Sequence, residues 1–69
     1  MTDAQFDALA SLLRMHSKPI LTAARLVLVA GEQQADAARE TGCPTSNVAR
    51  AVVQLRDADA RIKQAYEIG

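Results

Sequence analysis

The chain has 69 residues and no net charge, because eight Lys and Arg residues balance eight Asp and Glu residues. Apolar residues make up 49% of it and charged residues 23%, which excludes a disordered segment, and its length allows one small domain. With one cysteine, Cys43, and one histidine, His16, neither an intramolecular disulfide nor a tetrahedral zinc site is expected. A core this small commonly needs a partner subunit, so we expect a homodimer.

No targeting or membrane segment is predicted. The first residues carry no basic region followed by an apolar run, as a signal peptide would. The longest apolar stretch, Leu26–Ala30, is far shorter than the roughly 20 residues of a membrane span. We expect a cytoplasmic protein that has no contact with membranes, no cofactor and no small-molecule ligand.

The first helix is predicted from a capping signal and an apolar period. Thr2 and Gln5 have the spacing of a capping box, which predicts a start at Asp3. Apolar residues then recur on one helical face, at Phe6, Leu9, Ala10 and Leu13. We expect the helix to end at Met15, because Pro19 moves the residue before it out of the helical conformation.

Two shorter helices follow. Pro19 suits the first turn of the second helix, and Gly31 is a natural stop. The run Leu26–Val29 is locally prone to form a strand, but we expect helix because no second strand is present to pair with it. A third helix is predicted over residues 33–41 and closed by Gly42.

The fourth helix begins at Pro44 or Thr45 and continues to the end of the chain. Asp57 with Arg61, and Asp59 with Lys63, are acid-before-base pairs at i, i+4 that support it. We therefore predict an all-α, four-helix domain with an extended C-terminal helix. Residues 1–56 form a helix-turn-helix DNA-binding domain, and residues 57–69 are a dimerisation extension. The expected dimer contacts are apolar residues of this helix: Leu55, Ala58, Ile62 and Tyr66.

The helix-turn-helix is predicted from residue sizes around Gly42. Two helices that cross steeply need a small residue at the crossing, here Ala38, and a turn residue that tolerates a positive φ. Cys43 and Val48 then face inward. At about 100° per residue, four polar side chains share an arc of about 100° opposite the core, with no acidic residue among them. We call these residues the polar stripe: Ser46, Asn47, Arg50 and Gln54.

The polar stripe has the chemistry of base recognition in the DNA major groove. Arg pairs with guanine, Asn and Gln pair with adenine, and Ser binds a base or a phosphate. Thr45, at the helix start, joins the stripe as a base contact. For phosphate we expect Gln33, Gln34 and Arg39, with Arg25 as an alternative.

The sequence also resembles the KorA/TrfB transcriptional repressors of plasmids. The resemblance rests on Thr-Asp-Ala-Gln-Phe at residues 2–6, Ala-Arg-Leu-Val-Leu-Val-Ala-Gly at 24–31, Gln34–Ala35, Gly42, and Asn-Val-Ala-Arg-Ala-Val at 47–52. It covers residues 2–56 without a gap. It implies a helical repressor that binds a palindromic operator as a dimer, with Thr45 and Arg50 as contacts of the recognition helix. The separate C-terminal dimerisation part of those repressors has no counterpart here, which is why the helix over residues 58–66 is our candidate.

Three functions were weighed. A sequence-specific DNA-binding repressor is favoured by the polar stripe. A small helical adaptor for another protein is the alternative, and the absence of net charge favours it, because nonspecific DNA affinity depends on phosphate neutralisation. An enzyme is not expected, because the sequence has no glycine-rich phosphate loop and no Ser or Cys placed to use His16.

Overall fold

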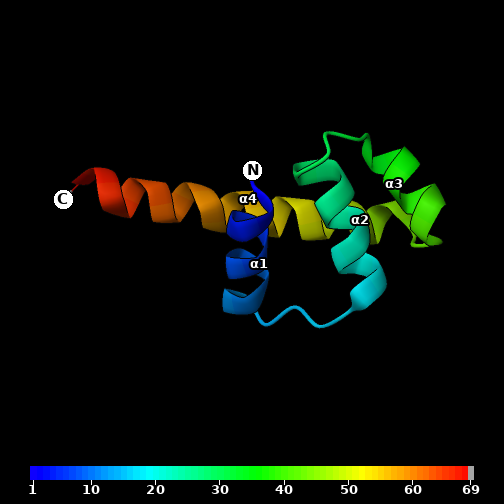
Figure 1. Ribbon diagram of the computed structural model, residues 1–69, viewed down its shortest axis with the longest axis horizontal. Coiled ribbons are helices and arrows are strands. Elements are labelled where there is room, and N and C mark those ends of the chain that lie inside the picture. Colours follow the sequence, from blue (N-terminus) through cyan, green and yellow to red (C-terminus); the bar gives the residue numbers. More distant parts are fainter. Residues whose placement is uncertain (69) are drawn as a thin grey trace.

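The computed structural model describes the backbone of residues 1–68 and the side chains of residues 1–66. Four α-helices follow one another: α1 (Asp3–Leu12), α2 (Lys18–Leu28), α3 (Gln34–Thr41) and α4 (Thr45–Ile68). Residues 1–68 contain no strand (Figure 1). The predicted all-α, four-helix domain is confirmed, and the strand-prone run Leu26–Leu28 is helical.

The start of α1 is the predicted capping box. The Thr2 backbone N–H donates to Gln5 Oε1 at 2.9 Å, and the Gln5 backbone N–H donates to Thr2 Oγ1 at 3.1 Å. Two N–H groups that the helix itself leaves unpaired are therefore satisfied. The backbone at the N-terminal end of α1 depends on residues three apart in sequence, which is why sequence reasoning found it.

The end of α1 differs from the prediction. The helix stops at Leu12, not at Met15, because Arg14 adopts a left-handed conformation with φ 55°. The Arg14 N–H donates to the Ser11 carbonyl at 3.1 Å, and the Met15 N–H donates to the Ala10 carbonyl at 3.0 Å. These two bonds form a Schellman motif. Met15 turns back against the core, so a tertiary contact ends this helix.

An arginine clamp joins α1 to α2. Arg25 of α2 donates to Asp3 at 2.6 Å and also to Asp7, and its guanidinium lies 4.6 Å from the centre of the Phe6 ring. The hydrogen bonds to Asp7 and Asp3 raise the pKa of Arg25, since they stabilise its charged form. With both carboxylates engaged, Arg25 is withdrawn from the list of phosphate candidates.

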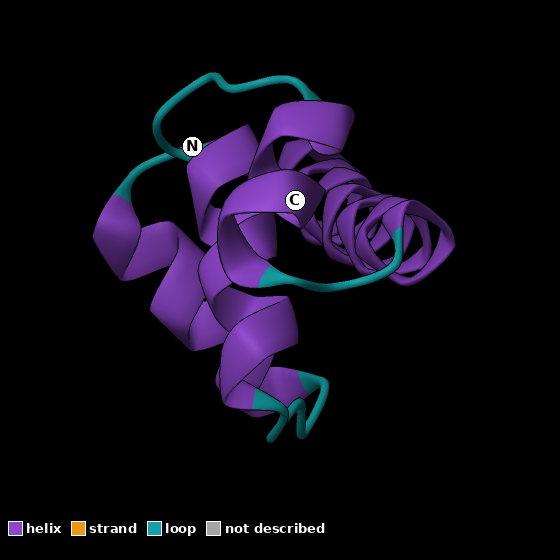
Figure 2. Ribbon diagram, turned by 90° about the vertical axis from the view of Figure 1, so that its right-hand side faces the viewer, coloured by secondary structure: helices purple, strands orange, loops and turns teal. Residues whose placement is uncertain are grey.

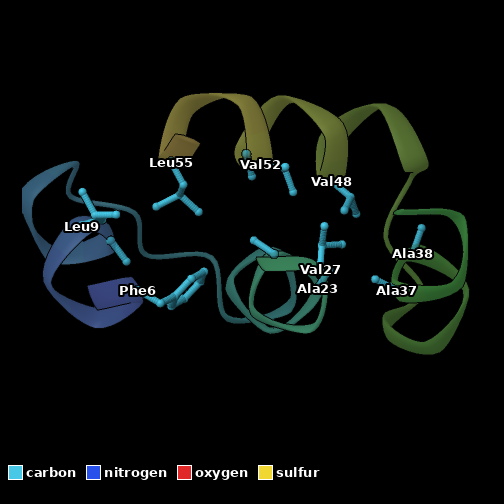
Figure 3. Packing of buried hydrophobic residues seen from close by; sticks show 12 residues of the cluster. Phe6, Leu9, Ala23, Val27, Ala37, Ala38, Val48, Val52 and Leu55 are labelled. Carbon is cyan, nitrogen blue, oxygen red and sulfur yellow. The ribbon is translucent and has the colours of Figure 1, made fainter. Parts of the chain in front are cut away.

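The core lies between α4 and the three shorter helices. Figure 2 views α4 nearly end-on, with the other helices gathered beside it. Figure 3 shows buried side chains of α1, α2 and α3 facing those of α4. Six of the twelve buried apolar residues are alanine, so the helices pack closely around few large side chains. The four largest fully buried residues are Phe6, Val48, Val52 and Leu55.

The C-terminal half of α4 projects past α1 (Figure 1), and the molecule measures 41 × 21 × 20 Å. The predicted ion pairs are present along it, Arg61 with Asp57 at 3.3 Å and Lys63 with Asp59 at 3.0 Å. Each contributes about 0.2–0.5 kcal/mol to helix stability. Tyr66 is 82% exposed, so the apolar period of α4 outlasts the body that covers it. No helix of the described chain is both long and apolar enough to cross a membrane.

Leu55 corrects the predicted dimer surface. Its side chain is fully buried and points between Phe6 and Leu9 (Figure 3), so it has no surface left for a second copy. The helical period placed it on the same face as Ala58 and Ile62, but α1 covers that face at Leu55. The surface that remains available comprises Ala58, Ile62 and Tyr66.

Replacing Leu55 by alanine should therefore destabilise the protomer rather than its assembly. We expect Leu55→Ala to lower the free energy of unfolding by about 2–5 kcal/mol, because it leaves a cavity in a closely packed core. The control is Val53→Ala, which removes a side chain that is 63% exposed on the same helix and should change stability by less than about 0.5 kcal/mol. Urea unfolding of both variants measures the difference, and equal losses would contradict the assignment.

Candidate nucleic-acid interface

The close crossing of α3 and α4 depends on small side chains. Ala37 and Ala38 of α3 are 0% and 4% exposed, and Figure 3 shows Ala38 directed toward α4 near Val48, which is also fully buried. A methyl group at this position lets the two helix backbones approach closely. A larger side chain here would push α3 away from the start of α4.

The turn between the two helices is set by Gly42. Its φ of 74° and ψ of 13° are left-handed, the conformation that glycine adopts at least cost. The Cys43 N–H then donates to the Ala38 carbonyl at 3.1 Å, and Cys43 packs half-buried against the core. The predicted stop at Gly42 is confirmed, and it redirects the chain within three residues.

Helix α4 starts at Thr45, which decides between the two predicted starts. The Pro44 carbonyl accepts from the Asn47 N–H at 3.0 Å and from the Val48 N–H at 3.2 Å. Pro44 therefore occupies the position before the helix, where its missing N–H costs nothing. The first three turns of α4 follow directly from the turn.

All four residues of the polar stripe are exposed, and so is Thr45. Between them, Val48 and Val52 are fully buried, so one helix separates a polar outer side from an apolar inner side. No Asp or Glu occurs in α4 before Asp57. The stripe is neither packed inside the protomer nor neutralised by its own helix.

The structure divides the predicted base contacts between two depressions. Asn47, Arg50 and Gln54 line one of them together with Met15 and Ile20, which come from the end of the α1–α2 connection and the start of α2. The other depression lies at the turn, where Thr45 lies close to Arg39. The neighbours of each group come from distant parts of the chain, which the helical period alone did not reveal.

The predicted phosphate contacts do not form one cluster. Gln33 is exposed and precedes α3 without a side-chain capping bond, so no side chain takes the free N–H groups of the first turn. Gln34 beside it is half-buried. Arg39 lies at the opposite end of α3, beside the turn, with a side chain 78% exposed and 3.4 Å from Asp36.

Acidic side chains surround the start of α3. Partial burial raises the pKa of Glu32, and the charge of Glu40, a hydrogen bond to Glu40 and the charge of Asp36 raise it further. These negative charges lie near Gln33 and Gln34 and oppose a phosphate there. Within the described residues no three His, Cys, Asp or Glu side chains come close enough to hold a metal ion.

Two exposed apolar residues beside the stripe were not singled out from the sequence. Val53, 63% exposed, follows the stripe on the outer side of α4, and its helical angle is within about 20° of that of Ser46. Leu13, 38% exposed, lines a third depression with Gln54, Asp57, Ala58 and Arg61. The helical period could have identified Val53, whereas Leu13 was expected in the core face of α1.

Comparison with known protein families places the chain in a class of transcriptional repressors. One family model matches residues 1–67. The chain belongs to that family, the TrfB plasmid transcriptional repressors (KorA). No curated protein and no solved structure matches the chain. The family resemblance seen over residues 2–56 is confirmed and extends into the projecting half of α4.

The left-handed turn predicts a specific cost for replacing Gly42. We expect Gly42→Ala to lower the free energy of unfolding by about 1 kcal/mol, because a Cβ disfavours a positive φ. No heavy atom lies within 4 Å of the added Cβ, so a steric clash with neighbours contributes nothing. Gly42→Asn is the matched control and should lose less, since Asn tolerates this conformation. Thermal unfolding of both variants tests the assignment, and equal losses would refute it.

The acidic cluster predicts a pH dependence. Because the folded-state pKa of Glu32 is raised above 4.5, the folded protein holds this proton more tightly than the unfolded chain. Glu32 therefore causes stability to fall as the pH rises from 4.5 through the folded pKa. We expect Glu32→Gln to raise the Tm at pH 7 and to flatten the pH profile in this window. A lower Tm at pH 7, or an unchanged profile, would contradict the cluster.

Proposed function

We propose that the chain is a sequence-specific DNA-binding repressor that reads its operator with the polar stripe of α4. In this proposal α3, the Gly42 turn and the first half of α4 are the helix-turn-helix. The observation that carries it is the exposure of the whole stripe on a helix without an acidic residue before Asp57. Membership of a family of plasmid transcriptional repressors supports the same conclusion.

The dimensions of the stripe suit the major groove. From Ser46 to Gln54 it extends about 12 Å at 1.5 Å per residue, and the groove is about 12 Å wide. Arg50 is the residue we assign to guanine, since none of the described ion pairs uses it. Asn47 and Gln54, which share a depression with Arg50, are assigned to adenine.

The remaining contacts extend the interface on either side of the stripe. Thr45 and Ser46 are assigned to bases at the helix start, where a hydroxyl donates or accepts. Val53 adds an apolar contact suited to the methyl group of thymine. Arg39 is the principal phosphate contact because it is exposed beside Thr45, and the N–H groups after Gln33, with Gln34, are assigned to a second phosphate.

A homodimer on a palindromic operator completes the proposal. A two-fold dimer presents two copies of the stripe, and two half-sites one helical turn apart are then bound together. The surface we assign to the dimer is the projecting half of α4, with Ala58, Ile62 and Tyr66. A projecting helix without tertiary cover is marginal in water, and a second copy would stabilise it.

A helical adaptor that binds another protein is the second candidate. The zero net charge favours it, and so do the exposed apolar side chains of Leu12 and Tyr66, which are 65% and 82% exposed. The two functions differ in salt response. DNA affinity falls steeply between two salt concentrations because counterions are released, whereas a largely apolar protein contact responds weakly.

Arg50→Ala tests the repressor directly. The assay is a gel shift on the DNA upstream of the protein's own gene, at two salt concentrations. We expect the variant to lose about 1–3 kcal/mol of binding free energy and to relax base preference at one position of each half-site. Arg56→Ala is the matched control, because it removes the same charge from an exposed position of α4 outside the stripe.

The comparison of the two variants decides the assignment. Equal losses for Arg50→Ala and Arg56→Ala would mean that only overall charge matters. Unchanged binding by Arg50→Ala would remove Arg50 from the interface. No salt-dependent shift for the unmodified chain would favour the adaptor.

A further inference from the structure

The depression between the end of α1 and the middle of α4 has no occupant within the described protomer. Leu13 and Ala58 supply apolar surface, and Gln54, Asp57 and Arg61 supply polar groups around it. An aromatic ring with a polar tip matches this combination, because its face needs apolar contact and its hydroxyl needs a partner. We propose that Tyr66 of a second copy of this chain occupies the depression. The proposal rests on the homodimer of the proposed function and names its contact.

Tyr66 cannot fill the depression of its own protomer. It lies eight residues beyond Ala58 on the same continuous helix, which is about 12 Å at 1.5 Å per residue. Its side chain is 82% exposed, although it is the one tyrosine in the sequence and the chain has no tryptophan. A large aromatic side chain left in solvent at the end of a projecting helix is available to a partner.

The chemistry of the depression is specific for a tyrosine. The ring would cover Leu13 and Ala58, and the hydroxyl would donate to the Asp57 carboxylate. Arg61, held 3.3 Å from Asp57, would lie beside the electron-rich ring face. A two-fold contact must be self-complementary, and here the tyrosine and its receptor lie on the same helix of each copy.

This contact also fixes where the two helices cross. If Tyr66 of each copy lies at Ala58 of the other, the two α4 helices run antiparallel and meet midway, at Ile62. Ile62 is half-buried and apolar, which suits a residue on the two-fold axis. Arg50 then lies about 18 Å from the axis along α4, so its two copies are about 36 Å apart. Half-sites one helical turn apart need about 34–36 Å.

The same contact connects assembly to the polar stripe. Gln54 lines the proposed tyrosine receptor and also the depression of Asn47 and Arg50. A tyrosine seated beside Gln54 would limit its rotamers and orient its amide. Assembly would therefore position one of the base-reading side chains in each half of the dimer.

The test is analytical ultracentrifugation of the full chain without DNA, over a range of concentrations. We expect a dimer, and we expect Tyr66→Ala to raise its dissociation constant about 1,000-fold, because two contacts are lost at about 30-fold each. Tyr66→Phe keeps the ring and should weaken the dimer only about tenfold. Leu13→Ser should act like Tyr66→Ala. Val53→Ala, an exposed apolar residue on another side of α4, is the control and should leave the dimer unchanged.

Tyrosine spectroscopy gives an independent readout. Because the chain has one tyrosine and no tryptophan, its near-ultraviolet circular dichroism reports Tyr66 specifically. The signal should rise with concentration in parallel with dimer mass, and Leu13→Ser should abolish the rise. A monomer at all concentrations, or a dimer that tolerates Tyr66→Ala, would overturn the proposal. Neither result depends on DNA, so failure of DNA binding by a normal dimer is distinguishable.

Discussion

The fold depends on the close crossing of α3 and α4 at Ala37 and Ala38. These two methyl groups let α3 lie against the buried side of α4, while the left-handed Gly42 returns the chain within three residues. The crossing fixes which side of α4 is inside. Because Val48 and Val52 are fully buried by it, the opposite side of the same turns must face solvent. The exposure of the polar stripe is therefore a consequence of core packing.

Charge is distributed so that a neutral chain can still present a basic residue to a polyanion. Arg25 is held by Asp3 and Asp7, and four further ionic side chains of α4 are paired with one another. Acidic groups gather around the start of α3, away from Arg50 along the chain. Recognition by such a surface rests on directed hydrogen bonds more than on bulk attraction, since phosphate neutralisation supplies little here.

Helix α4 combines the two proposed activities in one continuous element. Its first half is supported by the core, and its second half projects beyond α1 with Tyr66 exposed. A rigid helix transmits position directly, so the place where two copies meet sets the distance between their stripes. Gln54 belongs to both regions, which makes dimer contact and base recognition structurally dependent on each other.

The sequence by itself determined the features that arise from residues a few positions apart. The capping box of Thr2, the stop at Gly42 and the angular grouping of the polar stripe all depend on local backbone geometry, and each could be predicted. Tertiary structure decided the rest. Met15 ends α1 early by packing on the core, and α1 buries Leu55 on a face that the helical period assigned to a partner. Which helix covers a given face is decided by contacts between distant segments, and a period within one helix carries no information about them.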